Sequence, residues 1–498
     1  MNLSEEQKQY IKSRGLSLAD LENQINLFKQ GTRYLNLNRP ADINDGIIQF
    51  DDKEVDTFDK HYLQLIQSKK VAKFVPASGA ATRMFKDLYS FLENKKVSDF
   101  VVQFIEHISQ FAFYRDLQTV LEQNGKDINQ LISENDYTTI IEYFLLEKGL
   151  NYGSLPKGLL NFHIEKDKIL TPIDEHIKET IAYAGEQALL SFTISEQFEK
   201  QFKQAIESAL LLHNKSDITY NLSYQKSETD TVAVDTDFNI VELDKQKVLL
   251  RPGGHGSLIE NLNDIDADII FIKNIDNVCA DSYFSTTVKY KRMLASVLVN
   301  IQEKIFKYSK SLENYDGTDV DFNRELKLFF KEELNIASGR IEKKPIEQQI
   351  QFYKDKLNRP IRVCGMVKNE GEPGGGPFWV EDKEGTVSLQ IVESSQIDMT
   401  DNTQEKIFKN ASYFNPVDLV CSVKDKQGKK YDLKQFVDKE AYFIANKSFQ
   451  GKEILALEHP GLWNGGMGNW NTIFVEVSSQ TFNPVKTVND LLRTAHQN

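Results

Sequence analysis

Three charged residues stand where a ligand phosphate or a divalent cation could be bound. Asp276 lies near the end of the apolar run "ADIIFIKNIDNV" (267–278), and α/β sheets bind ligands at the carboxyl ends of their strands. A carboxylate there can hold Mg²⁺ together with phosphate oxygens, although a turn or N-cap aspartate is the alternative. Lys157 and Lys486 could neutralise phosphate charge, but taken singly each is more often a solvated side chain.

One alanine-rich loop could bring its backbone against an anion. "VAKFVPASGAATRMF" (71–85) is typical of a buried strand, a turn of small residues and a helix start, where backbone N–H groups can face an anion. The turn matches neither the P-loop nor the dinucleotide-binding pattern, and a tight strand–helix turn explains it equally well. Its candidate ligand-binding residues are Ser78, Gly79, Ala80, Ala81 and Thr82, followed by the positive charge of Arg83.

A second loop, "RPGGHGSL", follows another apolar strand. Gly253, Gly254 and Gly256 remove three Cβ atoms, and glycine costs backbone entropy on folding, so an unusual turn or a ligand lying against the main chain is expected. His255 could contact that ligand or simply cap the turn. Gln225 could donate to and accept from a nucleobase edge, or it could be an exposed loop glutamine.

A third glycine-rich segment, "KNEGEPGGGPFW" (368–379), lies between predicted strands and contains four glycines. That is too many for a simple hairpin. Glu370 and Glu372 could accept hydrogen bonds from sugar hydroxyls, and solvated turn carboxylates are the equal alternative.

Composition narrows the class of protein. The 498 residues carry a formal net charge of −13, which argues against nonspecific nucleic-acid binding, because that depends on clustered lysine and arginine. Three cysteines without C-x-x-C spacing favour a reducing compartment. The N-terminus lacks the apolar core of a signal peptide, and no apolar run is long enough to span a bilayer. We therefore expect a soluble cytoplasmic protein with no membrane partner.

The alternation of helices and buried strands in the first 300 residues predicts an α/β fold with a sheet covered on both faces. After Arg359-Pro360 the pattern changes to short strands and glycine-rich turns. We expect four consecutive parts: an N-terminal helical segment (1–70), a nucleotide-binding α/β core (71–285) with a helical insertion (86–150), a second helical insertion (286–358), and a β-rich sugar-side region with a C-terminal lysine segment (359–498).

The order of these motifs resembles the UDP-sugar pyrophosphorylase family. "SGAATR" is similar to its G-G-x-G-T-R loop, "PKGLLNFHIEKDKILTPIDEH" (156–176) to its P-K-x-L-L segment, and "PGGHGSL" with "FIKNIDN" to its P-G-G/H-G and strand-final D-N pair. "FNPVKTVNDLL" resembles the family's lysine-bearing C-terminal stretch. Ser78 and Ala81 stand where the family has glycine, so a divergent bacterial branch is indicated.

The resemblance implies a Rossmann-like, glycosyltransferase-A type nucleotidyltransferase core with a mixed central sheet. It implies Mg²⁺-dependent formation of an NDP-sugar and pyrophosphate from an NTP, most simply UTP, and a sugar 1-phosphate. The implied catalytic residues are Arg83, Lys157 and Lys486, and the metal ligand is Asp276. The implied nucleotide-binding residues are Ser78 to Thr82, Gln225, Gly253, Gly254 and His255, and the sugar-binding residues are Glu370, Glu372, Gly375, Glu393 and Asn415.

Three other interpretations remain open at this level. A glycosyltransferase on the same fold would use the NDP-sugar as its donor. A nucleotide- or sugar-binding regulator would have lost the chemistry through the changes at Ser78 and Ala81. A structural α/β protein would bind no nucleotide. The sequence leaves the sugar and the oligomeric state open.

Overall fold

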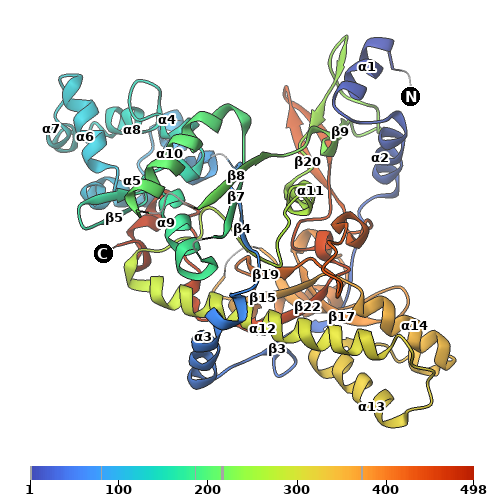
Figure 1. Cartoon of the computed structure of the whole chain (residues 1–498). Coiled ribbons are helices and arrows are strands. Elements are labelled where there is room, and N and C mark those ends of the chain that lie inside the picture. The colour runs from blue at the N-terminus through green and yellow to red at the C-terminus, as the bar shows by residue number, and fades with distance from the viewer. Residues whose placement is uncertain (1–2, 80, 186, 215–217, 372–373, 498) are drawn as a thin grey trace. The chain divides into compact units, whose positions relative to one another are not determined.

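The computed structural model describes residues 3–79, 81–185, 187–214, 218–371 and 374–497. The chain divides into two compact units, and both are built from segments far apart in the sequence (Figure 1). The first unit comprises Met1–Lys70, Gln225–Ile270 and Met293–Val477, and the second comprises Val71–Tyr224, Phe271–Arg292 and Ser478–Asn498. The compact units are therefore discontinuous in sequence, and the four consecutive parts expected from the sequence stay a prediction.

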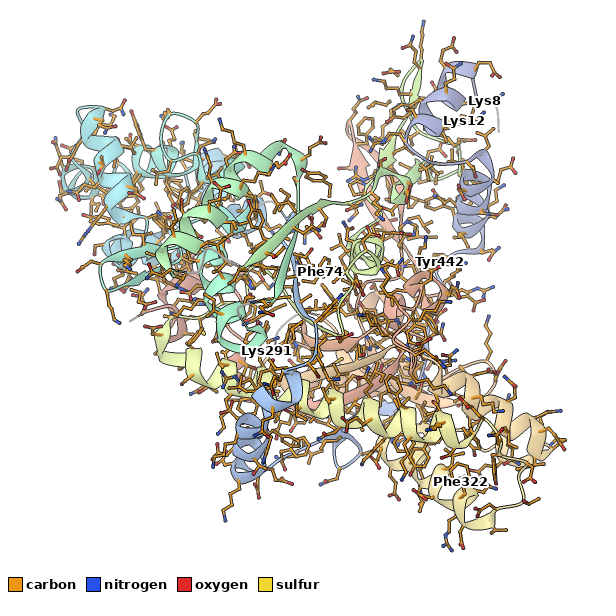
Figure 2. All side chains as sticks on the ribbon, viewed as in Figure 1. Lys8, Lys12, Phe74, Lys291, Phe322 and Tyr442 are labelled. Atoms are coloured by element: carbon orange, nitrogen blue, oxygen red, sulfur yellow. The ribbon has the colours of Figure 1, made fainter. Side chains whose placement is uncertain are left out.

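The second unit is built on parallel strands. β4 (Val71–Pro76) pairs with β7 (Leu189–Ile194), which pairs with β8 (Thr219–Tyr224). The last three residues of β13 (Ile269–Lys273) also belong to this unit. Apolar side chains of α9 (Pro172–Glu179) and α10 (Glu199–Leu212) pack with those of β7 in one core. Because β4 and β13 are buried along almost their whole length, they appear in the sequence as continuous apolar runs, such as the one containing Phe74 (Figure 2).

A group of helices adds a further core to the second unit (Figure 1). Each of the longer ones has an apolar face, and a cluster of phenylalanine rings, with Phe113 and Phe144 at 4.4 Å between centroids, fills the space between them. Val278 and Val485 pack into the same core, so this core anchors the chain segments that contain these two valines. The helices are α4 (Lys86–Asn94), α5 (Asp99–Glu106), α6 (Tyr114–Gln123), α7 (Ile128–Ser133) and α8 (Tyr137–Leu145); a hairpin of β5 (His163–Glu165) and β6 (Lys168–Leu170) follows.

The first unit is rich in strands. β15 (Ile361–Lys368) pairs parallel with β22 (Asn471–Glu476) and antiparallel with β19 (Asp418–Ser422), and β22 continues to β3 (Gly46–Ile48) and β2 (Asp42–Ile43). The prediction of an α/β fold with a mixed central sheet is thus confirmed. A second sheet has the order β1 (Asn36–Pro40), β16 (Gly376–Glu381), β17 (Val387–Val392), β14 (Ile336–Ala337).

A third sheet of the first unit has the order β12 (Leu250–Arg251), β9 (Thr231–Val234), β21 (Lys452–Glu458), β20 (Phe443–Phe449). Its core includes apolar residues of the two N-terminal helices and the buried Tyr442 (Figure 2). The short strands are β10 (Glu242–Asp244), β11 (Lys247–Val248) and β18 (Tyr413–Phe414).

The N-terminal 70 residues contain three helices and also β1, β2 and β3, which the sequence pattern did not predict. These strands have two to five residues, too few to show a clear alternation. Within the described residues, no helix combines the length and the apolar character that crossing a membrane requires. The remaining helices are α1 (Glu5–Ser13), α2 (Leu18–Gln30), α3 (Asp52–Ile66), α11 (Ile259–Asn263), α12 (Asp281–Ser311), α13 (Val320–Leu328), α14 (Ile346–Leu357) and α15 (Asn402–Lys409).

Candidate functional site

Lys157, Asp276 and Lys486 meet in the second unit. The Nζ of Lys157 lies 2.7 Å from Oδ2 of Asp276, and the Nζ of Lys486 lies 3.1 Å from the same oxygen. Lys157 also donates to the backbone carbonyl of Val485, at 2.7 Å. Two ammonium groups and one carboxylate from three distant segments therefore form a single charged cluster, which we call the Lys–Asp–Lys cluster.

Local backbone structure holds each member of the cluster. Lys157 begins a one-turn 3₁₀ helix, Lys157–Leu159, directly after Pro156. Asp276 follows β13, and Asn277 forms an isolated β-bridge with Pro484, which brings the two chain segments together. The backbone N–H of Lys486 donates to a carboxylate oxygen of Asp490 at 2.8 Å. These contacts explain how the loop after a buried strand and the C-terminal segment come to share one site.

The electrostatics of the cluster favour charge on Asp276. Burial alone would raise the pKa of Asp276, but the charges of Lys157 and Lys486 outweigh it and hold that pKa below its ordinary value. Burial lowers the pKa of Lys157, and the attraction of Asp276 offsets only part of that shift. The side chain of Lys486 is 58% exposed, against 12% for Lys157, so Lys486 is the lysine that can reach an incoming anion.

The other carboxylate oxygen of Asp276 tests whether Mg²⁺ fits here. Oδ1 is buried and has no hydrogen-bond partner among the described residues. A buried carboxylate oxygen without a donor is costly unless a ligand satisfies it, and Mg²⁺ accepts a single protein carboxylate when phosphate oxygens supply further ligands. The described residues contain no group of three or more acidic, histidine or cysteine side chains able to hold a metal by themselves. Asp276 therefore fits a metal that is shared with a phosphorylated substrate.

The alanine-rich loop only partly follows the expected pattern. Strand β4 leads into a 3₁₀ helix, Ala81–Phe85, before α4 begins, and the N–H of Ala81 already donates to the carbonyl of Leu155. Gly79 faces open space, and Thr82 and Arg83 are exposed. Ser78 accepts a hydrogen bond from the Ser195 hydroxyl through its carbonyl. Ala80 lies outside the described residues.

The glycine loop of the first unit is explained by its own packing. A Cβ on Gly253 would lie 2.3 Å from the ring of His459, and one on Gly256 would lie 2.2 Å from the carbonyl oxygen of Pro460. Because residues 459–460 press directly on the loop backbone, glycine is required there without any ligand. Nucleoside binding at Gly253, Gly254 and His255 thus stays a prediction that the glycines themselves do not support.

His255 has a structural contact that the sequence left open. Its ring stacks on Trp463, with centroids 4.4 Å apart and an angle of 17° between the planes, and its Nδ1 accepts from the N–H of Leu462 at 3.0 Å. Burial lowers the pKa of His255 to about 4, so the ring is neutral at pH 7. His255 therefore holds the segment around residue 462 in place.

This contact predicts an acid-sensitive stability. The folded-state pKa of His255 lies below the ordinary value of 6.5, so its contribution is present above pH 6.5 and is lost as the pH falls towards 4. Between pH 7.5 and pH 4.5 the unfolding free energy of the wild type should fall by about 2–3 kcal/mol more than that of His255→Gln, which cannot take up this proton. Urea unfolding at both pH values measures this difference. Equal losses in both proteins would contradict the neutral, accepting ring.

Three of the residues assigned to the sugar lie together in the first unit. The N–H of Asn415 donates to the carbonyl of Gly375 at 2.8 Å, and a Cβ on Gly375 would lie 3.4 Å from Cγ of Glu393. Burial raises the pKa of Glu393, which also hydrogen-bonds with Trp463 and Asn464. The structure thus brings Gly375, Glu393 and Asn415 into one polar group and adds Asn464, from the glycine-rich loop "LWNGGMGNWN".

No described contact connects Glu370 or Gln225 to the polar group around Glu393. Glu370 is exposed, and Glu372 lies outside the described residues. Nε2 of Gln225 is buried without a hydrogen-bond partner among the described residues, which leaves that amide donor available. The role of Gln225 at a nucleobase stays a prediction.

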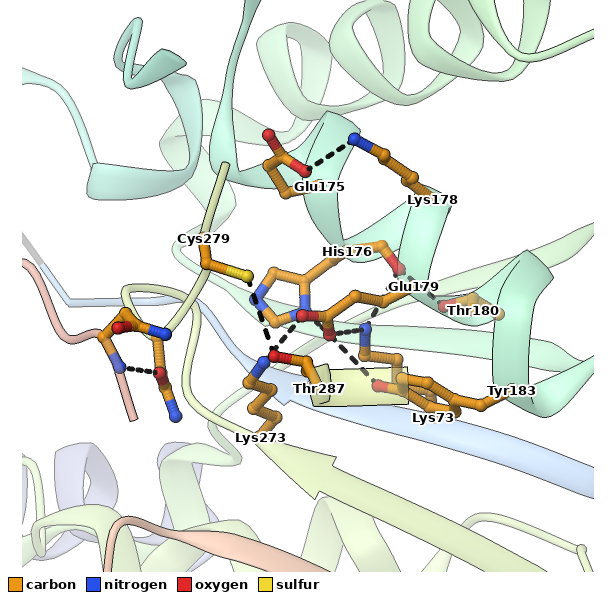
Figure 3. A network of polar contacts seen from close by, with 12 residues as sticks. Lys73, Glu175, His176, Lys178, Glu179, Thr180, Tyr183, Lys273, Cys279 and Thr287 are labelled. Atoms are coloured by element: carbon orange, nitrogen blue, oxygen red, sulfur yellow. Dashed lines mark hydrogen bonds and ion pairs between the residues drawn. The ribbon is translucent and has the colours of Figure 1, made fainter. Parts of the chain in front are cut away.

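Sequence reasoning did not identify a buried charge network in the second unit (Figure 3). Glu179 accepts from the ammonium groups of Lys73 (2.8 Å) and Lys273 (2.6 Å), and all three side chains are at most 1% exposed. Nε2 of His176 lies 3.3 Å from the carbonyl of Ile275, the residue before Asp276. A lysine inside each of two apolar strands, in "VAKFV" and "FIK", was the signal that could have indicated this network.

Comparison with known proteins gave a family and several similar structures. Residues 4–497 match the family described as "Domain of unknown function (DUF4301)", and no curated protein matches the sequence. Among solved structures, the uridine diphosphate N-acetylglucosamine pyrophosphorylase from Trypanosoma brucei, in complex with an inhibitor, is similar at 12% identity, over 91% of this chain and 72% of that chain, with a TM-score of 0.47.

Two further structures are similar at the same level. The UDP-glucose pyrophosphorylase from Leishmania major, known in open and closed structures, shares 12% identity over 99% of this chain and 79% of that chain, with a TM-score of 0.42. A UDP-glucose phosphorylase from Trypanosoma brucei shares 12% identity over 99% and 80%, with a TM-score of 0.43. At this identity the likeness concerns the fold, and the residues of the site have to carry any functional conclusion.

Proposed function

We propose that this chain, which belongs to the DUF4301 family, is a Mg²⁺-dependent nucleotidyltransferase that makes an NDP-sugar and pyrophosphate from an NTP, most simply UTP, and a sugar 1-phosphate. The observation that carries the proposal is the Lys–Asp–Lys cluster, in which Lys157, Asp276 and Lys486 converge within 3.1 Å. Its members are the residues on which the motif resemblance independently placed phosphate and metal binding.

The reaction needs charge neutralisation more than acid–base chemistry. A phosphate oxygen of the sugar 1-phosphate forms a bond to the α-phosphorus of the NTP, while the bond from that phosphorus to the pyrophosphate oxygen breaks. Negative charge develops on the departing pyrophosphate, and positioned ammonium groups stabilise it. Lys486, more exposed than Lys157, turns from Asp276 to the substrate phosphates, and Lys157 stays paired with Asp276.

Asp276 has two roles in the proposal. Its Oδ2 keeps the ammonium group of Lys157 charged and in place although burial opposes that charge. Its free Oδ1 would hold Mg²⁺, which when bound supplies positive charge to the substrate phosphates. Arg83, exposed after β4, would add a contact to the triphosphate.

The remaining assignments complete the substrate sites. Backbone groups of Ser78 to Thr82 would contact the triphosphate, and Gln225, Gly253, Gly254 and His255 would contact the nucleoside. Glu393, Asn415 and Gly375 would bind the sugar through the polar group described above, and Glu370 and Glu372 would lie near it. The sugar assignment is supported by the close approach of Glu393, Asn415 and Gly375 to one another.

A direct assay tests the proposal. A thermal-shift screen of NTPs with Mg²⁺ selects the nucleotide, and coupled detection of pyrophosphate with a panel of sugar 1-phosphates then measures turnover. Turnover that requires both substrates and Mg²⁺ is the expected result. Nucleotide binding without pyrophosphate release would favour a regulator, and consumption of an NDP-sugar without pyrophosphate release would favour a glycosyltransferase.

A further inference from the structure

The first unit contains a cavity of about 670 Å³ that none of the assigned residues lines. It is bounded by the segment before β1, the end of α14, the turn after β16, strand β17 and the loop around residues 464–469. Gly375, Glu393 and Asn415 do not belong to its wall. The volume is sufficient for a ligand of the size of a monosaccharide derivative.

Two positive charges on the wall of this cavity form no short ion pair among the described residues; Asp355 and Asp382 attract both of them, but only from a longer distance. Lys356 and Arg359 are partly buried, and among the described residues neither has a carboxylate within 4.0 Å. Arg359 donates only to the backbone carbonyl of Asn469, at 3.2 Å, and the ammonium of Lys356 lies 5.2 Å from the centroid of the Phe352 ring. Burial, followed by the charge of Arg359, lowers the pKa of Lys356 to about 8, so each cation costs free energy in the absence of an anion.

The other cations of the wall have a short ion pair. Arg33 and Lys383 share the carboxylate of Glu440. This leaves Lys356 and Arg359 as the pair whose charge a ligand could balance. An anion bound between them would relieve their mutual repulsion as well as their partial desolvation, so the gain on binding exceeds that of a single exposed ion pair.

Polar groups that bind hydroxyls line the rest of the cavity. Its wall includes the hydroxyl of Ser388 and the carboxylates of Asp382 and Glu384. It also includes the amide side chains of Gln390 and Asn464, each of which already donates one hydrogen bond to a backbone carbonyl. Carboxylates accept from hydroxyls and repel a second anionic group. A ligand that has one anionic group and several hydroxyls matches both parts of this wall.

We propose that this cavity is a binding site for an anionic sugar derivative, whose phosphate or carboxylate group contacts Lys356 and Arg359 and whose hydroxyls contact the remaining polar side chains. The cations of this site are separate from the residues assigned to nucleotidyl transfer, and only Asn464 is shared with the polar group around Glu393, so the site stands whether or not that activity is found. Its ligand differs from a nucleotide in needing no base-binding surface.

Calorimetric titration of the whole protein tests the site. The probes are inorganic phosphate, glucose 1-phosphate and glucuronate, with uncharged glucose as the negative probe. We expect at least one anionic probe to bind the wild type, and Lys356→Gln combined with Arg359→Gln to weaken that binding by about tenfold or more, because two charge-assisted contacts are lost. Lys354→Gln, which removes one positive charge from the helix that carries Lys356 but at a position outside this wall, is the control for Lys356→Gln and should bind as the wild type does.

The pattern of binding identifies the ligand class and can overturn the proposal. Binding of phosphate and glucose 1-phosphate alone indicates a phosphorylated sugar, and binding of glucuronate alone indicates a sugar acid. Lys200→Ala, at an exposed position of α10 outside this wall, should leave the binding unchanged. No binding of any anion, equal binding to the double variant, or equal binding of glucose would each refute the site.

A stability measurement separates ligand binding from a structural role. Lys356→Gln removes a cation that forms no short ion pair and whose burial outweighs the attraction of Asp382 and Glu384, so the Tm of the unliganded variant should equal or exceed that of the wild type. The Tm increase that the anion produces in the wild type should disappear in the variant. A lower Tm without ligand would show that Lys356 stabilises the fold and would contradict the proposal.

Discussion

Pyrophosphate release by Lys486→Ala is expected to fall by roughly 10²–10³-fold, because one preorganised positive charge on the transition state is lost. The side chain of Lys486 is 58% exposed, and its only described side-chain contact is Oδ2 of Asp276 at 3.1 Å. Its removal should therefore leave the unfolding free energy nearly unchanged. Steady-state pyrophosphate release with saturating NTP, together with urea unfolding, measures both quantities.

Variants of the partners sharpen this prediction. Asp276→Asn keeps the shape of the side chain but removes the charge that holds Lys157 and the oxygen proposed for Mg²⁺, so turnover should fall at least as far as in Lys486→Ala. Lys200→Ala, at an exposed position of α10 in the same unit, is the control for loss of a lysine and should keep wild-type turnover. Unchanged turnover in Lys486→Ala or Asp276→Asn would remove that residue from the proposed mechanism.

Glu179→Gln is expected to cause the largest loss of stability, about 3–5 kcal/mol of unfolding free energy. Burial alone would raise the pKa of Glu179, but Lys273 and Lys73 outweigh it and hold that pKa well below its ordinary value. The neutral amide leaves two ammonium groups, each at most 1% exposed, without a counter-charge. Urea unfolding at pH 7 measures the loss.

The control for Glu179→Gln is the same substitution in an exposed pair. Glu142→Gln breaks an ion pair with Lys148 whose side chains are 31% and 47% exposed, and it should cost at most about 1 kcal/mol. Replacing Glu179, Lys73 and Lys273 together by methionine should restore much of the stability, because no unpaired buried charge remains. A loss below about 1 kcal/mol in Glu179→Gln would show that the network contributes little to folding.

Glu179 and His176 also connect the network to the Lys–Asp–Lys cluster. Lys273, which Glu179 binds, is the last residue of β13, and the carbonyl near His176 belongs to Ile275. Both contacts therefore act on the short segment that ends in Asp276. A folded Glu179 variant with reduced turnover and an unchanged KM would show that the network positions the carboxylate.

Much of the fold could be predicted because a buried strand appears in the sequence as a short run of mostly apolar residues. The apolar run at 267–278 contains β13, and the run beginning at Val71 contains β4. The strands of the N-terminal 70 residues were missed, since two to five residues carry too little pattern. Local patterns also could not predict that each compact unit draws on distant parts of the chain.

The candidate site shows the same division. The sequence singled out Lys157, Asp276 and Lys486 as candidates, through their motifs, and their catalytic roles stay predictions. The convergence of these three residues could not be predicted, because 119 and 210 residues separate Asp276 from its two lysines, and only the packing of the strand ends and the C-terminal segment closes those distances.

For the glycine loop, the sequence left two explanations open. The three glycines indicated either an unusual turn or a ligand lying against the main chain, and in the structure His459 and Pro460 occupy the space beside two of them. Glycines in a loop indicate that something packs closely against the backbone, but they do not indicate whether it is a ligand or another part of the protein. By itself, the sequence determined which segments become buried strands, amphipathic helices and glycine-rich loops, because these depend on residues a few positions apart. Only tertiary contacts between distant segments decided which charges meet. The same contacts decided which glycines lie against neighbouring protein atoms and which cations form no short ion pair.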